Sequence, residues 1–410
     1  MVTLLDSADL KKLRSKIEKI TPLGIALLAG AEADRDERRY DLGVISPGVD
    51  PAAPLVQNFL RKRIDMIGEL ELSFELCECP VVAITGTNGK TTTTELVARM
   101  FNACGVRTLA SGNIGPAFAA TVRKSRELDL MTLEVSSFQL ERIRTFRPQI
   151  AVWLNFTPDH LDRYASLEEY RDAKLRIFEN QTEEDFAVVN LRDQLPALRA
   201  QKITFSAYEN GGDFEYRDGA IFHHGELALK MSEAKLRGLH NVENLMAALG
   251  TGLAKGLGFA QMAPPLCSYI ALPHRCELVR TLNGVEYVND SKATNLDALE
   301  KALDSESRPV TLIAGGKDKG FEFDTITDLV AQKCRRVMLI GEMSQRIADL
   351  WQKRVQCEKA SSLADAVLRA RSGAGHGEVV LLSPGTSSFD MFKNYADRGN
   401  QFREIVQSLS

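Results

Sequence analysis

One turn between an apolar run and a helical stretch constrains this chain more than any other feature. The run Val81–Thr85 is strand-like, glycines 86 and 89 follow at once, and a helix is expected from about residue 91 to 104. Glycines let backbone N–H groups turn toward phosphate oxygens, and a helix start adds a favourable dipole. The segment therefore predicts a phosphate-binding loop in an α/β domain.

The loop is a shortened variant of the common phosphate loop. Ile84 occupies the place of the first glycine in the pattern Gly-x-x-x-x-Gly-Lys-Thr. Lys90 is expected to bridge the β- and γ-phosphates of ATP, and the Thr91 hydroxyl to hold Mg²⁺. A helix start with a chance lysine is the alternative, which the strand–turn–helix context disfavours. The predicted nucleotide-contacting residues are Gly86, Thr87, Asn88, Gly89, Lys90, Thr91 and Thr92.

Short apolar runs alternate with helical patterns along the rest of the chain. This alternation implies parallel sheets built from βαβ units, with ligands bound beyond the carboxyl ends of the strands. Further strands are expected at 128–133, 150–155, 310–314, 336–340 and 378–382, and helices at 168–180, 323–333 and 361–371.

The predicted fold is α/β with three domains, each with a mainly parallel sheet. Linkers are expected near residues 68–75 and 272–275, where a proline interrupts the pattern. These boundaries give a truncated Rossmann-like N-terminal domain at 1–70, a P-loop ATPase-like central domain at 71–271 and a Rossmann-like C-terminal domain at 272–410.

The first domain begins with a strand, residues 2–6, that ends in an acid. In nucleotide-binding α/β domains such an acid contacts a ribose, and it normally lies ~20 residues after a glycine-rich turn. The chain begins too late to include that turn, so the domain is expected to lack its first strand and helix or to use a shorter design. From this segment alone, Asp6 is interpreted as a strand-end residue.

Bulk composition excludes several classes of function. The net charge of −4 gives no general attraction to nucleic acid. The longest apolar runs are strand-sized, far short of the ~20 residues that span a bilayer. Seven cysteines occur without a Cys-x-x-Cys pair, which indicates reduced thiols. We therefore expect a cytoplasmic protein that binds neither membrane nor nucleic acid.

Polar residues collect just beyond two predicted strands. Glu134 follows one strand, and Asp159 and His160 follow the next. An acid one strand away from a phosphate loop commonly holds Mg²⁺, which prefers oxygen ligands. A solvated glutamate, a structural histidine and a surface lysine at position 174 are the alternatives when each residue is taken alone.

Taken together, these segments resemble the Mur ligases of peptidoglycan synthesis, and the match narrows to the D-glutamate-adding branch. The resemblance extends from about residue 46 to the end of the chain, in the family's order. Besides the phosphate loop and the pair Tyr170 and Lys174, the matching blocks are 112–115, 134–141, 159–164, 238–244, 273–275, 289–295, 315–320 and 382–390.

The resemblance implies an ATP-dependent ligation. The carboxylate of UDP-N-acetylmuramoyl-L-alanine would attack the γ-phosphate of ATP, and the amine of D-glutamate would then attack the acyl phosphate. Two Mg²⁺ ions are implied, one held by Thr91 and Glu134 and the other by His160 and Lys174. The second site requires Lys174 to be carbamylated, as its family counterpart is. The implied catalytic residues are Lys90, Glu134, His160 and Lys174.

The remaining site residues follow from the same resemblance, which also favours a monomer. Asn244, Arg275 and Asp290 would hold the adenosine and phosphates. Lys292 would reach toward the ATP or the muramyl end, and Lys319, Ser388 and Phe389 would bind D-glutamate. The sugar nucleotide would contact Asp6, Ser46, Asn113 and Ser136.

Three other interpretations stay open on the sequence. One is a sister Mur ligase or a folylpolyglutamate synthase-like enzyme, although the Asp-Asn-Pro-Arg motif of the diaminopimelate- and lysine-adding relatives is absent. Another is a nucleotide-binding module without catalysis, and the third is a P-loop NTPase that drives motion. Phosphate release that depends on an added amino acid separates these classes.

Overall fold

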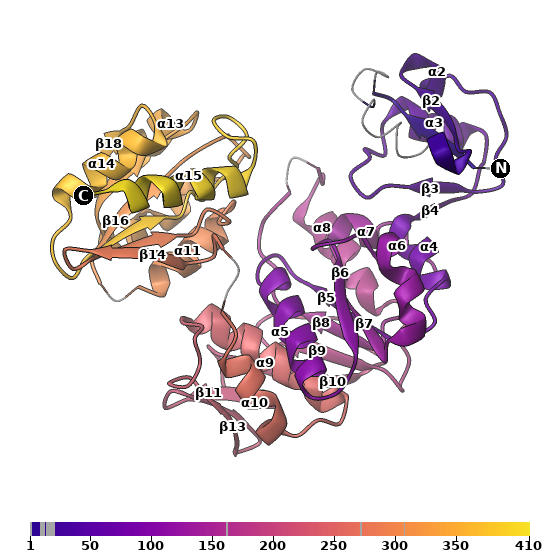
Figure 1. Ribbon diagram of the computed structural model, residues 1–410, viewed down its shortest axis with the longest axis horizontal. Helices are drawn as coiled ribbons and strands as arrows, with labels where there is room; N and C mark the ends of the chain where they lie inside the picture. The colour runs from indigo at the N-terminus through magenta and orange to yellow at the C-terminus, as the bar shows by residue number, and fades with distance from the viewer. Residues whose placement is uncertain (1, 9–12, 14–20, 161–162, 271–272, 307) are drawn as a thin grey trace.

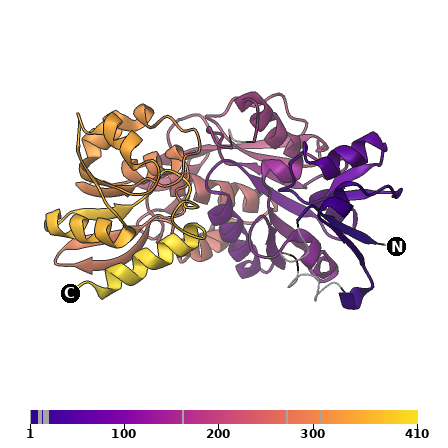
Figure 2. The same cartoon turned by 90° about the horizontal axis from the view of Figure 1, so that it is seen from above.

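The computed structural model describes residues 2–8, 13, 21–160, 163–270, 273–306 and 308–410. Its strands fall into three groups that follow one another along the chain (Figure 1). The two termini lie at opposite ends of an elongated molecule, with the central group between them (Figure 2). We call these groups the first, central and third units.

The first unit holds four short parallel strands divided between two pairs. Strand β1 (Thr3–Asp6) pairs with β2 (Ala26–Ala29), and β3 (Gly43–Ile45) pairs with β4 (Met66–Gly68). Within the described residues no strand of one pair is hydrogen-bonded to the other pair. The helical segments here are η1 (Thr21–Leu23), α2 (Ala31–Asp34) and α3 (Pro54–Arg61).

The segment 68–75, where a linker was expected, forms helix α4 (Glu69–Glu75). The Glu71 carboxylate is fully buried and accepts hydrogen bonds from the backbone N–H groups of Arg144, Thr145 and Phe146 at 2.8, 2.6 and 3.1 Å. These bonds fasten α4 to the central unit, which explains why the segment is ordered rather than a hinge.

The central unit is one nine-stranded sheet with the order β13-β12-β11-β10-β9-β8-β5-β7-β6. Strand β5 (Val81–Thr85) lies inside the sheet and is buried throughout, as its continuous apolar sequence predicts. All strands run in the same direction except β12, which is antiparallel to both β11 and β13, so that β11–β13 form a meander. The other strands are β6 (Thr108–Gly112), β7 (Leu130–Glu134), β8 (Ile150–Trp153), β9 (Phe186–Asn190), β10 (Gln201–Ser206), β11 (Phe214–Arg217), β12 (Ala220–His223) and β13 (Glu226–Lys230).

Helices cover both faces of this sheet. On one face α5 (Lys90–Ala103), α9 (Leu239–Ala254) and α10 (Phe259–Cys267) enclose an apolar core. On the other face α4 and the shorter helical segments pack against a second core. These segments are α6 (Phe118–Thr121), η2 (Val122–Glu127), α7 (Ser137–Leu140), α8 (Leu167–Leu175) and η3 (Arg176–Phe178).

The third unit is a six-stranded sheet with the order β14-β15-β19-β16-β17-β18, parallel except for β14. One face is covered by α11 (Leu296–Asp304), α12 (Thr327–Lys333) and α13 (Ser344–Trp351), and the other by α14 (Leu363–Gly373) and α15 (Tyr395–Ser408). The remaining elements are β14 (Glu277–Leu282), β15 (Val285–Asn289), β16 (Val310–Ala314), η4 (Phe323–Ile326), β17 (Cys334–Leu339), β18 (Gln356–Lys359) and β19 (Val379–Leu382).

The predicted α/β class with mainly parallel sheets is confirmed. The strands predicted at 81–85 and 310–314 match β5 and β16 at both ends, and the other predicted strands are shifted by one or two residues at one or both ends. The domain limits at residues 70 and 271 stay a prediction. Among the described residues, no helix combines the length and apolarity that crossing a membrane requires.

Candidate functional site

A cavity of about 320 Å³ lies between the phosphate loop and the third unit. Its wall is mostly polar and comes from loops that follow the carboxyl ends of strands in both large sheets, where ligands of parallel sheets bind. The predicted site residues that line it are Thr87, Asn88, Gly89, Lys90, Thr91, Thr92, Asn113, Glu134, His160, Asn244, Arg275, Asp290, Lys292 and Lys319.

The phosphate loop joins β5 to α5 and is held by Asn155, which follows the neighbouring strand β8. The Asn155 side chain accepts from the Asn88 N–H at 2.9 Å and donates to the Asn88 carbonyl at 3.1 Å. Gly89 has a φ of 82°, and a Cβ there would lie 2.3 Å from the Asn244 Oδ1, so only glycine fits. These contacts fix the conformation of the loop.

Lys90 folds back onto the loop that it follows. Its Nζ donates to the carbonyl oxygens of Gly86 at 2.9 Å and Thr87 at 2.7 Å. Burial lowers the pKa of Lys90, while Glu134 and Asp159 act in the opposite direction. A phosphate group in the cavity would offer this ammonium a stronger, charged acceptor than the two carbonyls.

Glu134 is the last residue of β7 and is only 3% exposed. Its Oε1 accepts from the Asn113 Nδ2 at 2.7 Å, whereas its Oε2 is buried without a hydrogen-bond partner. A buried carboxylate oxygen without a partner is costly unless a cation neutralises it. Together with the Thr91 hydroxyl in the same cavity, this oxygen fits the ligand preference of Mg²⁺.

Lys174 lies on α8 and is 2% exposed, beneath the phosphate loop. Its Nζ donates to the Gly86 carbonyl at 2.8 Å and lies 4.7 Å from the centre of the Tyr170 ring. Burial, followed by the charge of Lys90, lowers the pKa of Lys174 well below its usual value. The side chain is thus a buried amine with a weakened hold on its proton, and the alternative of a surface lysine is wrong.

His160 sits in the left-handed backbone region, with φ at 55°. Its ring packs 4.9 Å from the Phe138 ring and 5.7 Å from the Tyr170 ring, centre to centre. Burial lowers its pKa, which favours the neutral imidazole that binds metals. Within the described ranges, His, Cys, Asp and Glu side chains alone form no group of three suited to a metal.

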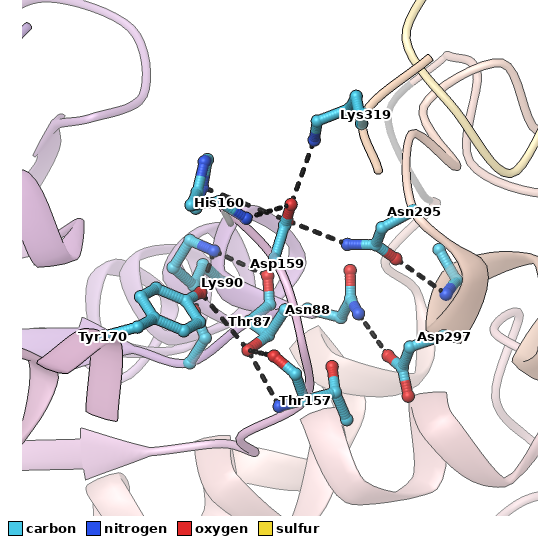
Figure 3. Close-up of polar contacts among 12 residues, drawn as sticks. Thr87, Asn88, Lys90, Thr157, Asp159, His160, Tyr170, Asn295, Asp297 and Lys319 are labelled. Atoms are coloured by element: carbon cyan, nitrogen blue, oxygen red, sulfur yellow. Dashed lines mark hydrogen bonds and ion pairs between the residues drawn. The ribbon is translucent and has the colours of Figure 1, made fainter. Parts of the chain in front are cut away.

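Asp159 connects the central and third units. Its Oδ1 accepts from the Lys319 Nζ and its Oδ2 from the Asn295 Nδ2, both at 3.0 Å, as Figure 3 shows. Burial alone would raise the pKa of Asp159, but the Lys319 ammonium, with His160 and Asn295, lowers it to about 2. The cavity is thus bridged by an ion pair on its third-unit side.

A second connection starts from the phosphate loop itself. The Asn88 Nδ2 donates to the Asp297 carboxylate on α11 (Figure 3). Asp159, Asn295 and Asp297 were not among the site residues predicted from the sequence. Asn295 is the last residue of the block 289–295 and Asp297 lies two positions beyond it, so their place in or next to that block was the available signal.

Two predicted residues of the third unit have unusual titration. Asp290 is buried, accepts from the Ser383 hydroxyl at 2.9 Å and the Cys276 N–H at 3.2 Å, and burial raises its pKa to about 7. The Lys292 Nζ lies 3.9 Å from the centre of the Tyr395 ring, and burial, aided by the charge of Arg275, lowers its pKa to about 8.

Five predicted substrate-binding residues do not line the cavity. Asp6 ends β1 and accepts from the Ala8 N–H at 2.9 Å, and Ser46 borders a separate small hollow. Ser136 caps α7, where its hydroxyl accepts from a backbone N–H at 3.4 Å. Ser388 is buried, whereas Phe389 is 68% exposed. The structure therefore brings together the nucleotide and metal candidates but not the whole substrate set.

Comparisons with known proteins agree with this geometry. A family model described as the Mur ligase middle domain matches residues 84–252, and one described as the Mur ligase glutamate ligase domain matches residues 274–385. A UDP-N-acetylmuramoylalanine–D-glutamate ligase of Geotalea uraniireducens is 43% identical, with 100% of this chain and 92% of the relative covered. The protein of that name in Pelotomaculum thermopropionicum is 40% identical, with 96% of this chain and 89% of the relative covered.

Solved structures show the same fold. The UDP-N-acetylmuramate-alanine ligase of Thermotoga maritima matches with a TM-score of 0.64 at 18% identity, covering 96% of this chain and 91% of its own. A MurF ligase of the same organism, solved with ADP, matches with a TM-score of 0.62 at 17% identity, covering 91% and 95%. With two family models and full-length relatives above 40% identity, this chain belongs to the Mur ligase family.

Proposed function

We propose that this protein joins D-glutamate to UDP-N-acetylmuramoyl-L-alanine, with ATP as the energy source and an acyl phosphate as the intermediate. The observation that carries the proposal is the cavity itself, which places the phosphate loop, the unpartnered Glu134 oxygen and Lys319 around one space. The names of two relatives that align with 100% and 96% of this chain give the same reaction. We propose further that the reaction takes place in the cytoplasm, and that the protein is a monomer that binds neither nucleic acid nor membrane.

The nucleotide would bind first on the phosphate loop. Backbone N–H groups at the start of α5 would face the β- and γ-phosphates, and Lys90 would exchange its two carbonyl acceptors for phosphate oxygens. The Arg275 guanidinium offers a fork of donors to phosphate oxygens. Asn244 and Asp290 hold the adenosine, and both already line the cavity.

The metal ligands proposed for the first Mg²⁺ are Thr91 and Glu134, and those for the second are His160 and a carbamylated Lys174. When bound, the two ions neutralise charge that develops on the transferred phosphoryl group. A carbamate forms when the neutral amine of Lys174 attacks CO₂, making an N–C bond and releasing one proton to solvent. The lowered pKa of Lys174 provides the required neutral amine.

The two organic substrates would approach from opposite sides. The sugar nucleotide would lie toward the first unit, against Asn113 and Ser136, with Asp6 and Ser46 nearer its uridine end. D-glutamate would lie toward the third unit, where the Lys319 ammonium exchanges Asp159 for a substrate carboxylate. Ser388 and Phe389 would complete that end, and Lys292 would face the reacting groups. We place the domain limits at residues 1–70, 71–271 and 272–410.

The test is phosphate release from ATP and Mg²⁺ with UDP-N-acetylmuramoyl-L-alanine and D-glutamate, each omitted in turn. Release that requires both substrates supports the proposal. L-glutamate and L-lysine are the controls, and release that prefers L-lysine would assign the protein to a sister ligase. Amino-acid-independent release would indicate a plain NTPase and would contradict the proposed ligation.

The carbamate is tested separately by carbon-13 NMR of protein equilibrated with labelled bicarbonate. We expect one carbamate resonance in the wild type and none in the variant Lys174→Ala. A wild-type spectrum without the resonance would overturn this assignment of the second metal site, while leaving the ligation itself to the phosphate assay.

A further inference from the structure

We propose that Asp297 is a positioning residue, which ties the phosphate loop to the third unit and thereby sets the closed arrangement in which ATP is bound. The inference rests on the proposed function for its catalytic consequence. Asp297 lies in the first turn of α11, next to the cavity but outside the set of residues predicted from the sequence. It touches no proposed substrate group and would act through Asn88.

The contacts of Asp297 are few and specific. Its side chain is 15% exposed and accepts from the Asn88 Nδ2 across the interface and from the Lys301 Nζ at 3.0 Å one turn along α11. The Lys301 ammonium neutralises the charge of the carboxylate. This pairing matters because both side chains are largely buried. A hydrogen bond to an ionised acceptor is roughly twice as strong as one between neutral groups.

Asn88 is well suited to transmit this contact. Asn155 holds its peptide group from the central unit on both the N–H and the carbonyl side. The backbone of Asn88 is therefore fixed, and its side chain points to Asp297 on α11 (Figure 3). Across the described parts of the chain, this is the sole hydrogen bond between residues 86–92 and the third unit.

A second contact fixes the same end of α11. Asn295 caps the helix by accepting from the Ala298 N–H at 2.9 Å, and it donates to Asp159 at 3.0 Å. The start of α11 therefore reaches two loops of the central sheet at once, the one after β5 and the one after β8. Two contacts fix the orientation of α11 relative to the central sheet, whereas a single contact would let the helix rotate about it.

The consequence concerns both nucleotide binding and water. Loss of the Asp297 contact would leave the loop intact but let the third unit tilt away from it. ATP would then bind to a smaller closed population, which raises its apparent dissociation constant. A looser closure would also admit water to the acyl phosphate, which would raise phosphate release without amide formation.

The experiment compares Asp297→Ala, Asp297→Asn and the matched control Asp304→Ala, which removes an exposed acid from the last position of the same helix. Binding of a fluorescent ATP analogue with Mg²⁺ is measured without other substrates, so the result stands even if the proposed ligation fails. We expect the dissociation constant to rise about tenfold in Asp297→Ala, less in Asp297→Asn, which keeps a neutral acceptor, and not in the control.

In the ligation assay we expect the ratio of phosphate to amide product to rise at least threefold in Asp297→Ala. A double-mutant cycle with Asn88→Ala excludes a merely structural role, because the second substitution should add little once the contact is gone. The proposal is overturned if Asp297→Ala binds the analogue within twofold of the control, or if the two substitutions are additive. Thermal unfolding shows that each variant is folded.

Discussion

Replacing Glu71 by alanine should destabilise the protein far more than its position on a short helix suggests. The carboxylate is fully buried and accepts three backbone N–H groups, together with the Thr145 hydroxyl at 2.6 Å. The three N–H donors belong to a loop that follows helix α7, so they receive no partner from a helix or a sheet. Glu71→Ala leaves all three without an acceptor. Phe146 is buried, whereas Arg144 and Thr145 are exposed residues whose N–H groups water can reach.

The magnitude follows from these donors. A buried donor that loses its partner costs about 1–3 kcal/mol, and the Phe146 N–H is such a donor. Water can replace the acceptor of the part-buried N–H groups of Arg144 and Thr145, so each of these bonds contributes only about 0.5–1.5 kcal/mol, and the expected total is about 2–6 kcal/mol. At about 2–4 °C per kcal/mol for a unit of this size, the melting temperature should fall by about 4–24 °C.

The assay is thermal and urea unfolding of Glu71→Ala beside Glu75→Ala, which removes an exposed glutamate from the same helix. The control should unfold within about 0.5 kcal/mol of the wild type. Glu71→Gln should fall between the two, because its amide keeps one acceptor oxygen. A free energy of unfolding for Glu71→Ala within 1 kcal/mol of the control would refute the reasoning.

Three further predictions concern the cavity. Glu134→Gln keeps the acceptor for Asn113 but loses the charge facing the metal, so kcat should fall at least ~100-fold with little change in melting temperature; an unchanged kcat would remove Glu134 from the metal site. Because the pKa of Lys292 is about 8, kcat/KM should fall above pH 8, and Lys292→Arg should move this limb to higher pH; an identical limb in both proteins would assign it elsewhere. Burial raises the folded-state pKa of Asp290 to about 7. Its contribution to the free energy of unfolding is therefore complete below pH 4, and it is lost as the pH rises from 4 through 7. The unfolding free energy of Asp290→Asn relative to wild type should therefore increase from pH 4 to 7, by up to about 1.4 kcal/mol per pH unit, and a pH-independent difference would contradict the shift.

The parts of the fold that sequence predicts well are those buried on both faces. Strands such as Val81–Thr85 and Val310–Ala314 are continuous apolar runs because helices cover the sheet on each side. The meander β11–β13 was missed, because its strands are half-exposed and their composition is mixed. The turn pairs Asp218-Gly219 and His224-Gly225, all at positive φ, were the signal that could have revealed it.

The candidate site also contains residues that the sequence could place and contacts that it could not. Groups held by the chain near them in sequence, such as Lys90 and Glu134, could be placed from a strand, a turn and a helix. Contacts between distant units, such as Asn88 with Asp297 across 209 positions, depend on how two sheets face one another, which no local pattern encodes. The attachment of the segment 68–75 to the central unit could not be predicted for a related reason, since a distant loop supplies the donors that contact Glu71.

The division of the first unit into two parallel pairs has a consequence for finding inhibitors. Strands of three or four residues with open edges exchange their amide protons quickly, because few neighbours must separate for them to open. A compound that binds near Asp6 and Ser46, where we propose that the uridine end lies, should therefore slow exchange over residues 26–29 and 43–45 more than anywhere in the large sheets. Mass spectrometry of deuterium uptake can then rank such compounds, and report where they sit, before any of them is tested for inhibition.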